Sequence, residues 1–276
     1  MPELPEAETI RRQLAPKVIG KIITGAWAKL PRRTLPSIEE FTARVHGQRI
    51  AAAARCGKQL YFPLDNGDNL LVHLGMTGRL AVEKSTFTLD SAPRHVQAAL
   101  TLSSGDQLVF RDPRTFGSIG VSRELPFLQT LGPEPLDDNF DINALAKKLK
   151  SRNVKIKSAL LDQSLIAGLG NIYADEACFE AHIHPAQIAS SISPAKLRTL
   201  CGTLKPLLER AIAARGATLK DKGYEDIFGQ HGEFIPHVYG RTGEPCDNCG
   251  TIIQRGVLGT SKTARSYHFC PKCQKK

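Results

Sequence analysis

The chain has 276 residues, enough for two domains, and its 41% hydrophobic and 23% charged residues are in the ordinary range for globular proteins. No stretch approaches the ~18 consecutive apolar residues that span a bilayer, and the acidic, proline-containing start is unlike a signal or transit peptide, so we expect a cytoplasmic protein without a membrane partner. The formal charge of +10 favours a polyanionic partner.

Pro2 follows the initiator methionine, and a small second residue permits removal of that methionine. Proline would then carry a free secondary amine, whose reference pKa of roughly 8 leaves more of it neutral and nucleophilic at pH 7 than a lysine with a pKa of ~10.4. Such an amine can attack a sugar C1′ and form an iminium, with Glu3 shuttling protons. Taken alone, however, Met1-Pro2-Glu3 is a common start without any such role.

Residues 1 to about 133 are predicted to be rich in short strands with few helices. Ser37-Ile38-Glu39-Glu40 is a capping box that opens a short helix ending near Gly47. Two hairpins are expected, one joining 60–64 to 70–74 through Asn66-Gly67 and one joining 96–102 to 107–110 through Ser104-Gly105. Regularly spaced short strands favour a sandwich or a barrel.

The stretch 132–138 is proline-punctuated and is predicted to be a linker. Beyond it the pattern becomes helical, with helices expected at 144–150, 154–161, 172–181 and 194–214. A connector with several glycines, about 216–236, then leads to a short cysteine-containing module.

Two segments are strongly basic: 147–157 has six basic residues and no acid, and 240–276 has seven against two acids. Separate basic patches fit a nucleic-acid backbone better than an ordinary solvated face does. Within the second segment, the small, polar stretch 259–266 could lie along a phosphate backbone with Arg265 gripping its oxygens, or could equally be a solvated hairpin tip.

Four cysteines form two Cys-x-x-Cys pairs separated by twenty residues: Cys246, Cys249, Cys270 and Cys273. Each pair puts two thiolates on one turn, and two such turns complete a tetrahedral site that leaves no open position for a substrate. One structural Zn²⁺ is the natural occupant, although iron binds the same geometry. The intervening 251–253 and 267–269 are predicted to be the two strands of a β-ribbon.

Several motifs, in order along the chain, resemble those of the formamidopyrimidine-DNA glycosylase family. They are Met1-Pro2-Glu3-Leu4-Pro5-Glu6 with Glu8-Thr9, His73-Leu74-Gly75-Met76, Asp112-Pro113-Arg114-Thr115-Phe116-Gly117, Leu131-Gly132-Pro133-Glu134-Pro135-Leu136, Gly168-Leu169-Gly170-Asn171-Ile172-Tyr173-Ala174-Asp175-Glu176 and the four cysteines. The resemblance spans nearly the whole chain. It implies an α+β multidomain fold: a β-sandwich catalytic domain with flanking helices (1–133), a helix-two-turns-helix DNA-binding domain (134–222), a lesion-capping loop (223–239) and a zinc-finger β-ribbon (240–276).

The resemblance also implies catalytic roles. Pro2 is similar to the nucleophile that forms a Schiff base, and Glu3 to the acid that assists opening of the sugar. Lys58 matches the lysine assigned to β-elimination, and Arg265 matches the arginine assigned to δ-elimination. A cation beside a leaving phosphate stabilises its charge, so these roles are chemically sensible.

An enzyme that acts on a base inside a duplex must extrude that base and fill the gap. By resemblance, Met76, Arg114 and Phe116 fill it, and their glycine neighbours predict loop tips, although singly each apolar residue would more often be core. Glu6 is expected near the lesion base. The remaining DNA contacts implied are His73, His95, Arg152, Lys157 and Asn171. The family tends to show His-x-His where this chain has Pro93-Arg94-His95.

These features predict a monomeric, nucleoid-associated repair enzyme that removes oxidised purines (8-oxoguanine and formamidopyrimidines) from duplex DNA and then cleaves the strand by β,δ-elimination. One alternative is the related endonuclease VIII enzymes, which prefer oxidised pyrimidines and have glycine where this chain has Leu4. The other is a non-catalytic zinc-ribbon DNA-binding protein, which would leave Pro2, Glu3 and Lys58 without a role.

Overall fold

The computed structural model describes residues 2–218, 224–260 and 264–276. The chain folds into two compact units, Met1–Gln129 with Asp221–Glu233, and Thr130–Lys220 with Phe234–Lys276. The predicted boundary between 222 and 223 lies outside the described residues, and the division into four parts stays a prediction.

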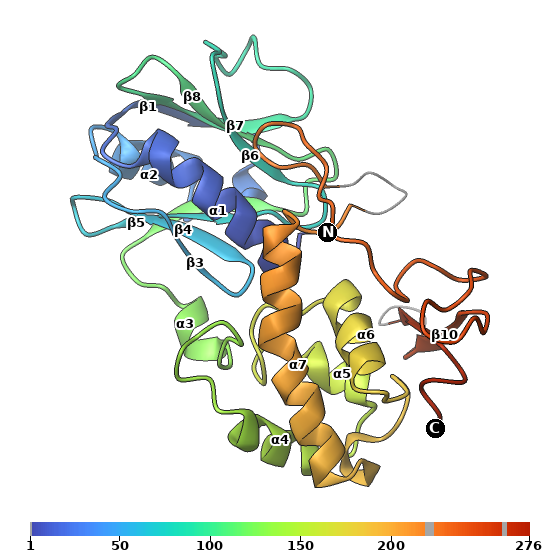
Figure 1. Ribbon diagram of the computed structural model, residues 1–276. Helices are drawn as coiled ribbons and strands as arrows, with labels where there is room; N and C mark the ends of the chain where they lie inside the picture. Colours follow the sequence, from blue (N-terminus) through green and yellow to red (C-terminus); the bar gives the residue numbers. More distant parts are fainter. Residues whose placement is uncertain (1, 219–223, 261–263) are drawn as a thin grey trace. The chain divides into compact units, whose positions relative to one another are not determined.

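The first unit is built on two β-sheets within its described residues (Figure 1). One sheet has the strand order β1-β7-β8-β6, and the other has the order β2-β9-β5-β4-β3, in which β2 runs parallel to β9. The strands are β1 Ile23–Ala28, β2 Thr34–Leu35, β3 Ala54–Cys56, β4 Gln59–Pro63, β5 Asn69–His73, β6 Arg79–Glu83, β7 Val96–Leu102, β8 Gln107–Arg111 and β9 Ser118–Ser122.

Both sheets contribute to one buried apolar cluster. Phe62 and Val72 come from one sheet, Leu100 and Phe110 come from the other, and all four are at most 2% exposed. Alternate residues of β4 are buried, as expected of a strand with one face on a core. The predicted β-sandwich is therefore confirmed, with α2 (Ile38–Val45) among the helices that flank it.

The local signals in this unit are confirmed. Strands β4 and β5 pair antiparallel around a turn in which Gly67 has a φ of 81°, and β7 and β8 do the same around Gly105. The Ser37 hydroxyl caps α2 by accepting the backbone N–H of Glu40, 3.1 Å away.

The N-terminal helix α1 (Leu4–Val18) was not expected from the sequence. Its first turn contains Pro5, but an N–H is not needed there because no residue of the helix can accept it. Glu3 and Glu6 form the capping box, with carboxylates where a hydroxyl is usual. The fifteen-residue helix buries Leu4, Ile10 and Leu14 in the first unit.

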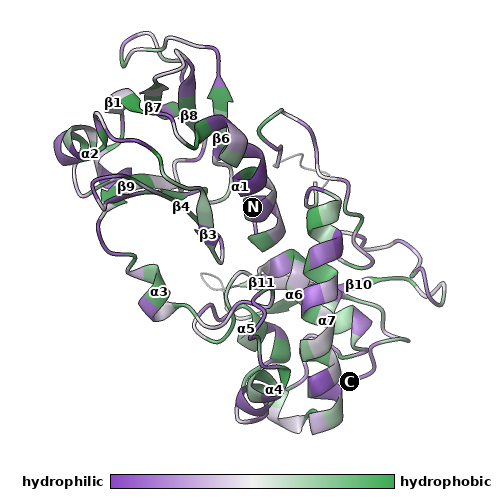
Figure 2. Ribbon diagram, turned by 60° about the vertical axis from the view of Figure 1, so that its left-hand side comes forward, coloured by the Kyte–Doolittle hydropathy of each residue, from purple (hydrophilic) through white to green (hydrophobic). Residues whose placement is uncertain are grey.

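The helices of the second unit coincide with the predicted segments: α4 Ile142–Lys150, α5 Ile156–Leu160, α6 Asn171–Glu180 and α7 Pro194–Ala213, preceded by the short α3 Phe127–Thr130. Two 3-10 turns lie at Pro31–Arg33 and Ala189–Ser191. Along α7 the buried residues recur every three or four positions (Leu197, Leu200, Leu204, Leu207, Leu208, Ala211), and Figure 2 shows both hydrophobic and hydrophilic residues on this helix. No helix in the described part of the chain is long and apolar enough to cross a membrane.

The β-ribbon of the second unit is formed by β10 (Gln254–Leu258) and β11 (Arg265–Phe269). The first strand was predicted at 251–253, three residues too early. These residues instead close the turn that carries the first cysteine pair, because the carbonyl of Thr251 accepts the Cys246 N–H and the N–H of Ile253 donates to the Glu244 carbonyl. The second predicted strand is confirmed, with two additional residues at its start.

Candidate active site and metal centre

The start of α1 places two carboxylates beside Pro2. Glu3 is the N-cap residue, and its backbone N–H donates to the Glu6 carboxylate over 2.8 Å. Both glutamates are 1% exposed, and Pro2 is buried as well. Because Pro2 immediately precedes the N-cap, the capping box fixes the backbone directly after Pro2.

Lys58 lies in the turn between β3 and β4, directly after Gly57, which has a φ of 55°. Burial lowers the pKa of the Lys58 ammonium, and the negative charges of Glu3 and Glu6 oppose that shift. Lys58 therefore lies within electrostatic range of Glu3 and Glu6, the two buried carboxylates that follow Pro2 in the chain. A lowered pKa makes the neutral amine, which is the form that accepts a proton, more available than in a free lysine.

Glu8 of α1, to which the sequence analysis assigned no role, fixes the turn between β3 and β4. Its carboxylate accepts from Arg11 and Arg12 and from Arg55 Nε at 3.1 Å, and Arg55 in turn donates to the Gly57 carbonyl over 2.8 Å. Burial opposes ionisation of Glu8, but the hydrogen bonds from Arg11 and Arg12 outweigh it and lower the pKa of Glu8 to about 2. The charged clamp holds the backbone immediately before Lys58.

Met76, Arg114 and Phe116 project from two turns that pack back to back. A Cβ on Gly75, whose φ is 61°, would lie 2.6 Å from the backbone nitrogen of Gly117, so the turns approach too closely for a side chain there. Met76 is 37% exposed and Phe116 is 46% exposed. The Arg114 guanidinium lies 5.0 Å from the centre of the Phe116 ring. The predicted placement of these residues at loop tips is confirmed.

The fully buried Asp112 joins these two turns, which the sequence analysis did not anticipate. Its carboxylate accepts the Thr77 hydroxyl at 2.6 Å from one turn. From the other turn it accepts the backbone N–H groups of Arg114 at 3.2 Å and Gly117 at 2.7 Å. A hydrogen-bonded buried carboxylate of this kind holds two loops in one geometry.

His73 ends β5, and its Nδ1 accepts the Gly75 N–H over 3.2 Å, which assigns the proton of the neutral ring to Nε2. Burial lowers the pKa of His73, as do the charges of Lys58 and Arg33. The lowered pKa favours the neutral ring, and because His73 is an exposed residue its Nε2–H is suited to donate to a phosphate oxygen. His95 is exposed just before β7, where its carbonyl accepts the Asp112 N–H at 2.9 Å.

In the second unit, Arg152 is exposed after α4, and Asn171 is the first residue of α6. The Asn171 Oδ1 is buried without a hydrogen-bond partner among the described residues. Lys157 is fully buried, which differs from the DNA contact predicted from the sequence. The cause is a buried ion pair with Asp175, whose Oδ1 lies 2.8 Å from the Lys157 ammonium.

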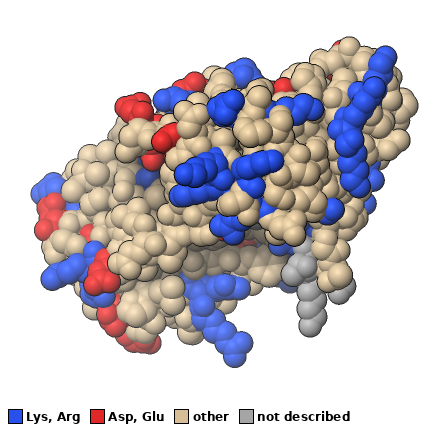
Figure 3. Space-filling view, turned by 90° about the horizontal axis from the view of Figure 1, so that it is seen from below, with Lys and Arg blue, Asp and Glu red and all other residues tan. Residues whose placement is uncertain are grey.

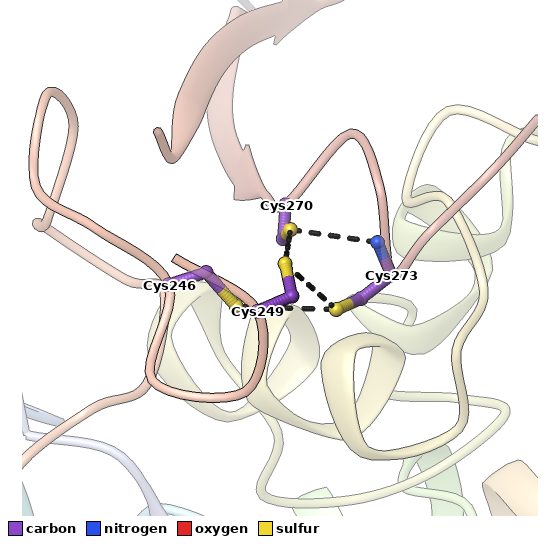
Figure 4. A group of neighbouring side chains, drawn as sticks. All are labelled: Cys246, Cys249, Cys270 and Cys273. Carbon is purple, nitrogen blue, oxygen red and sulfur yellow. Dashed lines mark hydrogen bonds between the residues drawn. The ribbon is translucent and has the colours of Figure 1, made fainter. Parts of the chain in front are cut away.

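The four cysteines converge at the base of the ribbon (Figure 4). Their sulfur atoms all lie within 4.8 Å of one another, and three of the separations are 3.4 Å (Cys249–Cys270), 3.5 Å (Cys249–Cys273) and 3.9 Å (Cys246–Cys273). A tetrahedral metal with bonds of about 2.3 Å to sulfur separates its ligands by about 3.8 Å. The cluster therefore fits a single metal ion.

Arg265 opens β11 with an exposed side chain, and its Nη1 donates to the Ala264 carbonyl at 3.0 Å. It belongs to the second unit, whereas Pro2, Glu3 and Lys58 belong to the first. Residues 261–263 of the predicted DNA-binding tip lie outside the described residues, as do 219–223 at the start of the predicted capping loop. Beyond these, Asp226 accepts from Gln13 of α1 at 2.9 Å.

Lysine and arginine side chains are visible across the face of the molecule in Figure 3, in keeping with the net charge of +10. Exposed cations spread over a surface attract a polyanion at long range, before any specific contact forms.

Two protein-family models match the chain. The model described as the formamidopyrimidine-DNA glycosylase N-terminal domain matches residues 1–119, and that described as the formamidopyrimidine-DNA glycosylase H2TH domain matches residues 131–223. Together they cover most of the sequence.

Curated relatives match over their whole length. A formamidopyrimidine-DNA glycosylase from Chloroflexus aurantiacus is 42% identical over 281 aligned residues, which cover 99% of this chain and 98% of the relative. A protein of the same name from Thermus thermophilus is also 42% identical, with the same coverage.

Solved structures agree in fold. The crystal structure of the MutM (Fpg) protein from Thermus thermophilus has a TM-score of 0.88 at 40% identity and covers 100% of this chain and 99% of that chain. Lactococcus lactis Fpg in complex with DNA containing an abasic site has a TM-score of 0.88 at 34% identity, covering 99% and 100%. The same protein with DNA containing Fapy-dG has a TM-score of 0.87 at 35% identity, with the same coverage.

Proposed function

The chain belongs to the formamidopyrimidine-DNA glycosylase family, and from that membership we propose that it excises oxidised purines, 8-oxoguanine and formamidopyrimidines, from duplex DNA and then cleaves the strand at the abasic site. The observation that carries this proposal is the cluster around the N-terminus. Two buried carboxylates, Glu3 and Glu6, follow the residue whose amine would attack the sugar, and both act electrostatically on the lowered-pKa amine of Lys58.

The first step uses Pro2 and Glu3. The neutral secondary amine of Pro2 attacks C1′, the glycosidic bond breaks, and the damaged base leaves with the bonding electron pair and the proton that the proline nitrogen loses. Glu3 gives a proton to the sugar ring oxygen, so that the ring opens and an iminium forms between C1′ and the proline nitrogen.

Strand cleavage follows from the acidity that the iminium confers on the neighbouring C–H bonds. Neutral Lys58 takes the proton from C2′, and the electron pair of that bond expels the 3′ phosphate. A second elimination, with loss of a proton from C4′, expels the 5′ phosphate, whose developing charge Arg265 stabilises. The lowered pKa of Lys58 supports its part, since only the neutral amine accepts a proton.

DNA is held open by the two packed turns of the first unit. Met76 and Phe116 are exposed apolar groups suited to insertion between bases, and Arg114, supported by Asp112, is suited to hydrogen bonds with the orphaned base. His73, as a neutral N–H donor, and Asn171, at the start of α6, suit phosphate oxygens. The exposed Arg152 and His95 are assigned as peripheral contacts.

The four-cysteine site is proposed to hold one structural zinc ion, because zinc is redox-inert and favours tetrahedral thiolate ligands. Bound there, zinc would hold the two cysteine turns at the base of the ribbon. No coordination position is left for a substrate, so the reaction is assigned to the side chains of the chain itself.

Lesion choice is assigned to Glu6 and the predicted capping loop 223–239. Leu4, rather than the glycine of endonuclease VIII enzymes, and relatives named for formamidopyrimidine favour purine lesions over pyrimidine lesions. The test is a panel of duplexes that each contain one lesion (8-oxoguanine, formamidopyrimidine, thymine glycol or none), assayed under single-turnover conditions. Faster release of the two purine lesions is expected, and a preference for thymine glycol would overturn the purine assignment.

A further inference from the structure

A buried charged network in the second unit lies outside the residues that the proposed chemistry uses. Lys157 on α5 and Asp175 on α6 are both fully buried, and their charged groups lie 2.8 Å apart. The second oxygen of Asp175 accepts two hydrogen bonds from His268 of β11, one from its backbone N–H at 2.9 Å and one from its Nδ1 at 3.1 Å. The network therefore ties the helix pair to the ribbon.

The Lys157 ammonium also donates to two backbone carbonyls. One belongs to Ser266, at 2.6 Å, and the other to Asn171, at 3.3 Å. Ser266 directly follows Arg265, and Asn171 opens α6, so one ammonium group holds the main chain at both proposed phosphate-binding positions. The ring of Tyr239 packs edge-on against His268 with ring centres 4.7 Å apart, and its centre lies 5.8 Å from the Lys157 nitrogen.

Burying a charged pair costs a large desolvation free energy, and an apolar pair of the same size in its place is often at least as stabilising. Its distinctive property is geometry: an ammonium with three directed donors can be satisfied in few arrangements of α5, α6 and β11. Where the side chain of Arg265 must meet one particular phosphate, a shift of about 1 Å can cost on the order of 10²-fold in rate.

We propose that Asp175 and His268, acting through Lys157, are positioning residues that set the place of Arg265 relative to Asn171 and thereby govern the second, δ-elimination step. This inference rests on the proposed function, in which Arg265 stabilises the second leaving phosphate. Lys157 then acts inside the protein rather than as a direct ligand of DNA.

The test compares Asp175→Asn and His268→Phe with the unchanged chain on duplex DNA containing an abasic site, with enzyme in excess. His268→Phe keeps the backbone hydrogen bond and the ring, so it serves if Asp175→Asn does not fold. Two quantities are measured: the rate of borohydride-trapped adduct formation, and the ratio of δ-elimination to β-elimination product. Leu204→Ala, which truncates a buried side chain on α7 outside the network, controls for general loss of stability at a matched thermal midpoint.

Both network variants are expected to form the trapped adduct at a nearly unchanged rate while the δ-to-β product ratio falls about tenfold or more, towards that of Arg265→Ala. A wild-type ratio in both variants, beside a lowered ratio in Arg265→Ala, would overturn this inference alone. An equal fall in Leu204→Ala would also overturn it, because general destabilisation would then suffice. A wild-type ratio in Arg265→Ala would remove the role of Arg265 from the proposed function, and this inference with it.

Lys157→Met adds a separate arm on binding. If Lys157 instead contacts DNA, this variant lowers the slope of log affinity against log salt by about 1 and leaves the product ratio unchanged, which contradicts the proposal. An unchanged slope with a lowered ratio supports it.

Discussion

The two regions that carry the proposed chemistry are held in place by different means. In the first unit, the proposed catalytic and DNA-inserting residues lie on a sandwich whose large apolar core includes Phe62 and Phe110, and the buried carboxylate of Asp112 joins the two exposed turns. The ribbon is different. Among the described residues, the apolar cluster that it shares with Phe179 of α6 is small and includes two cysteines: Phe179, Val238, Cys246, Ile253 and Cys270. Position is thus set by apolar packing in one region, whereas the other relies on a buried charged network and on four cysteines that could bind a metal ion.

The largest expected effect follows from removing the proposed metal site, on which the ribbon but not the sandwich depends. Cys249→Ala, or strong chelation, is expected to unfold the ribbon, because binding of structural zinc supplies on the order of 10 kcal/mol or more to small modules. DNA affinity should fall while the sandwich stays folded. Metal content, DNA binding and hydrogen exchange of the strands in the first unit check this, and undiminished DNA binding after verified metal loss would sink the assignment.

Within the first unit, Lys58→Ala is expected to slow strand cleavage by about 10²–10⁴-fold, the usual contribution of a positioned proton acceptor, with little change in binding. Lys84→Ala is the matched control, since it removes the same charge from an exposed position of the same unit. The two variants are compared in single-turnover cleavage and in DNA binding. Equal behaviour of both would show that Lys58 contributes only charge.

Arg114→Ala should weaken binding to lesion DNA by roughly 1–3 kcal/mol and flatten the preference among bases opposite the lesion, because a guanidinium rewards particular hydrogen-bond acceptors. A simple phosphate contact would lower affinity for damaged and undamaged DNA equally. Arg123→Ala, which removes an exposed arginine of the same unit, is the control. The order of preference among opposite bases decides between the two roles: if it survives the loss of Arg114, the orphan-base assignment is wrong.

A smaller effect is expected in the pH dependence of strand cleavage, which reports on the charges around Lys58. Burial lowers the pKa of Lys58 and the charges of Glu3 and Glu6 oppose this, so cleavage of abasic DNA should increase as pH rises through a value below that of a free lysine. Glu6→Gln removes one opposing charge while keeping an acceptor for the Glu3 N–H. The ascending limb of the rate profile should therefore move to lower pH, and a limb that stays in place or moves to higher pH would contradict an electrostatic influence of Glu6 on Lys58.

The sequence predicted those features that local signals determine. Hairpin turns at Asn66-Gly67 and Ser104-Gly105, the helix capped by Ser37 and the two cysteine turns need only neighbouring residues, and all are present. The N-terminal helix was not predicted, because its N-cap residue is a glutamate rather than the usual serine, threonine, aspartate or asparagine, and because a proline such as Pro5 is also typical of irregular structure.

Other features depend on partners far away in the chain. Lys157 belongs to a basic stretch and was expected at the surface. It is instead buried, because it forms an ion pair with Asp175, which also accepts hydrogen bonds from His268 of β11. Asp112 similarly gains its role only when Thr77, distant in sequence, is folded against it. Pairing between residues far apart in the chain leaves no periodicity or spacing signal in a single sequence. The burial of Lys157 and the supporting role of Asp112 could therefore be seen only in the structure.

The proposed mechanism requires the amine of Pro2 as the nucleophile, and this is tested by locating the covalent bond between enzyme and DNA. Enzyme is trapped on DNA containing 8-oxoguanine with borohydride, digested, and the modified peptide is sequenced by mass spectrometry. The account predicts a chain that begins at Pro2 and carries the sugar remnant on its N-terminal nitrogen, with no adduct when that amine is blocked by an N-terminal extension. An adduct on Lys58, or on active protein that retains Met1, would contradict it.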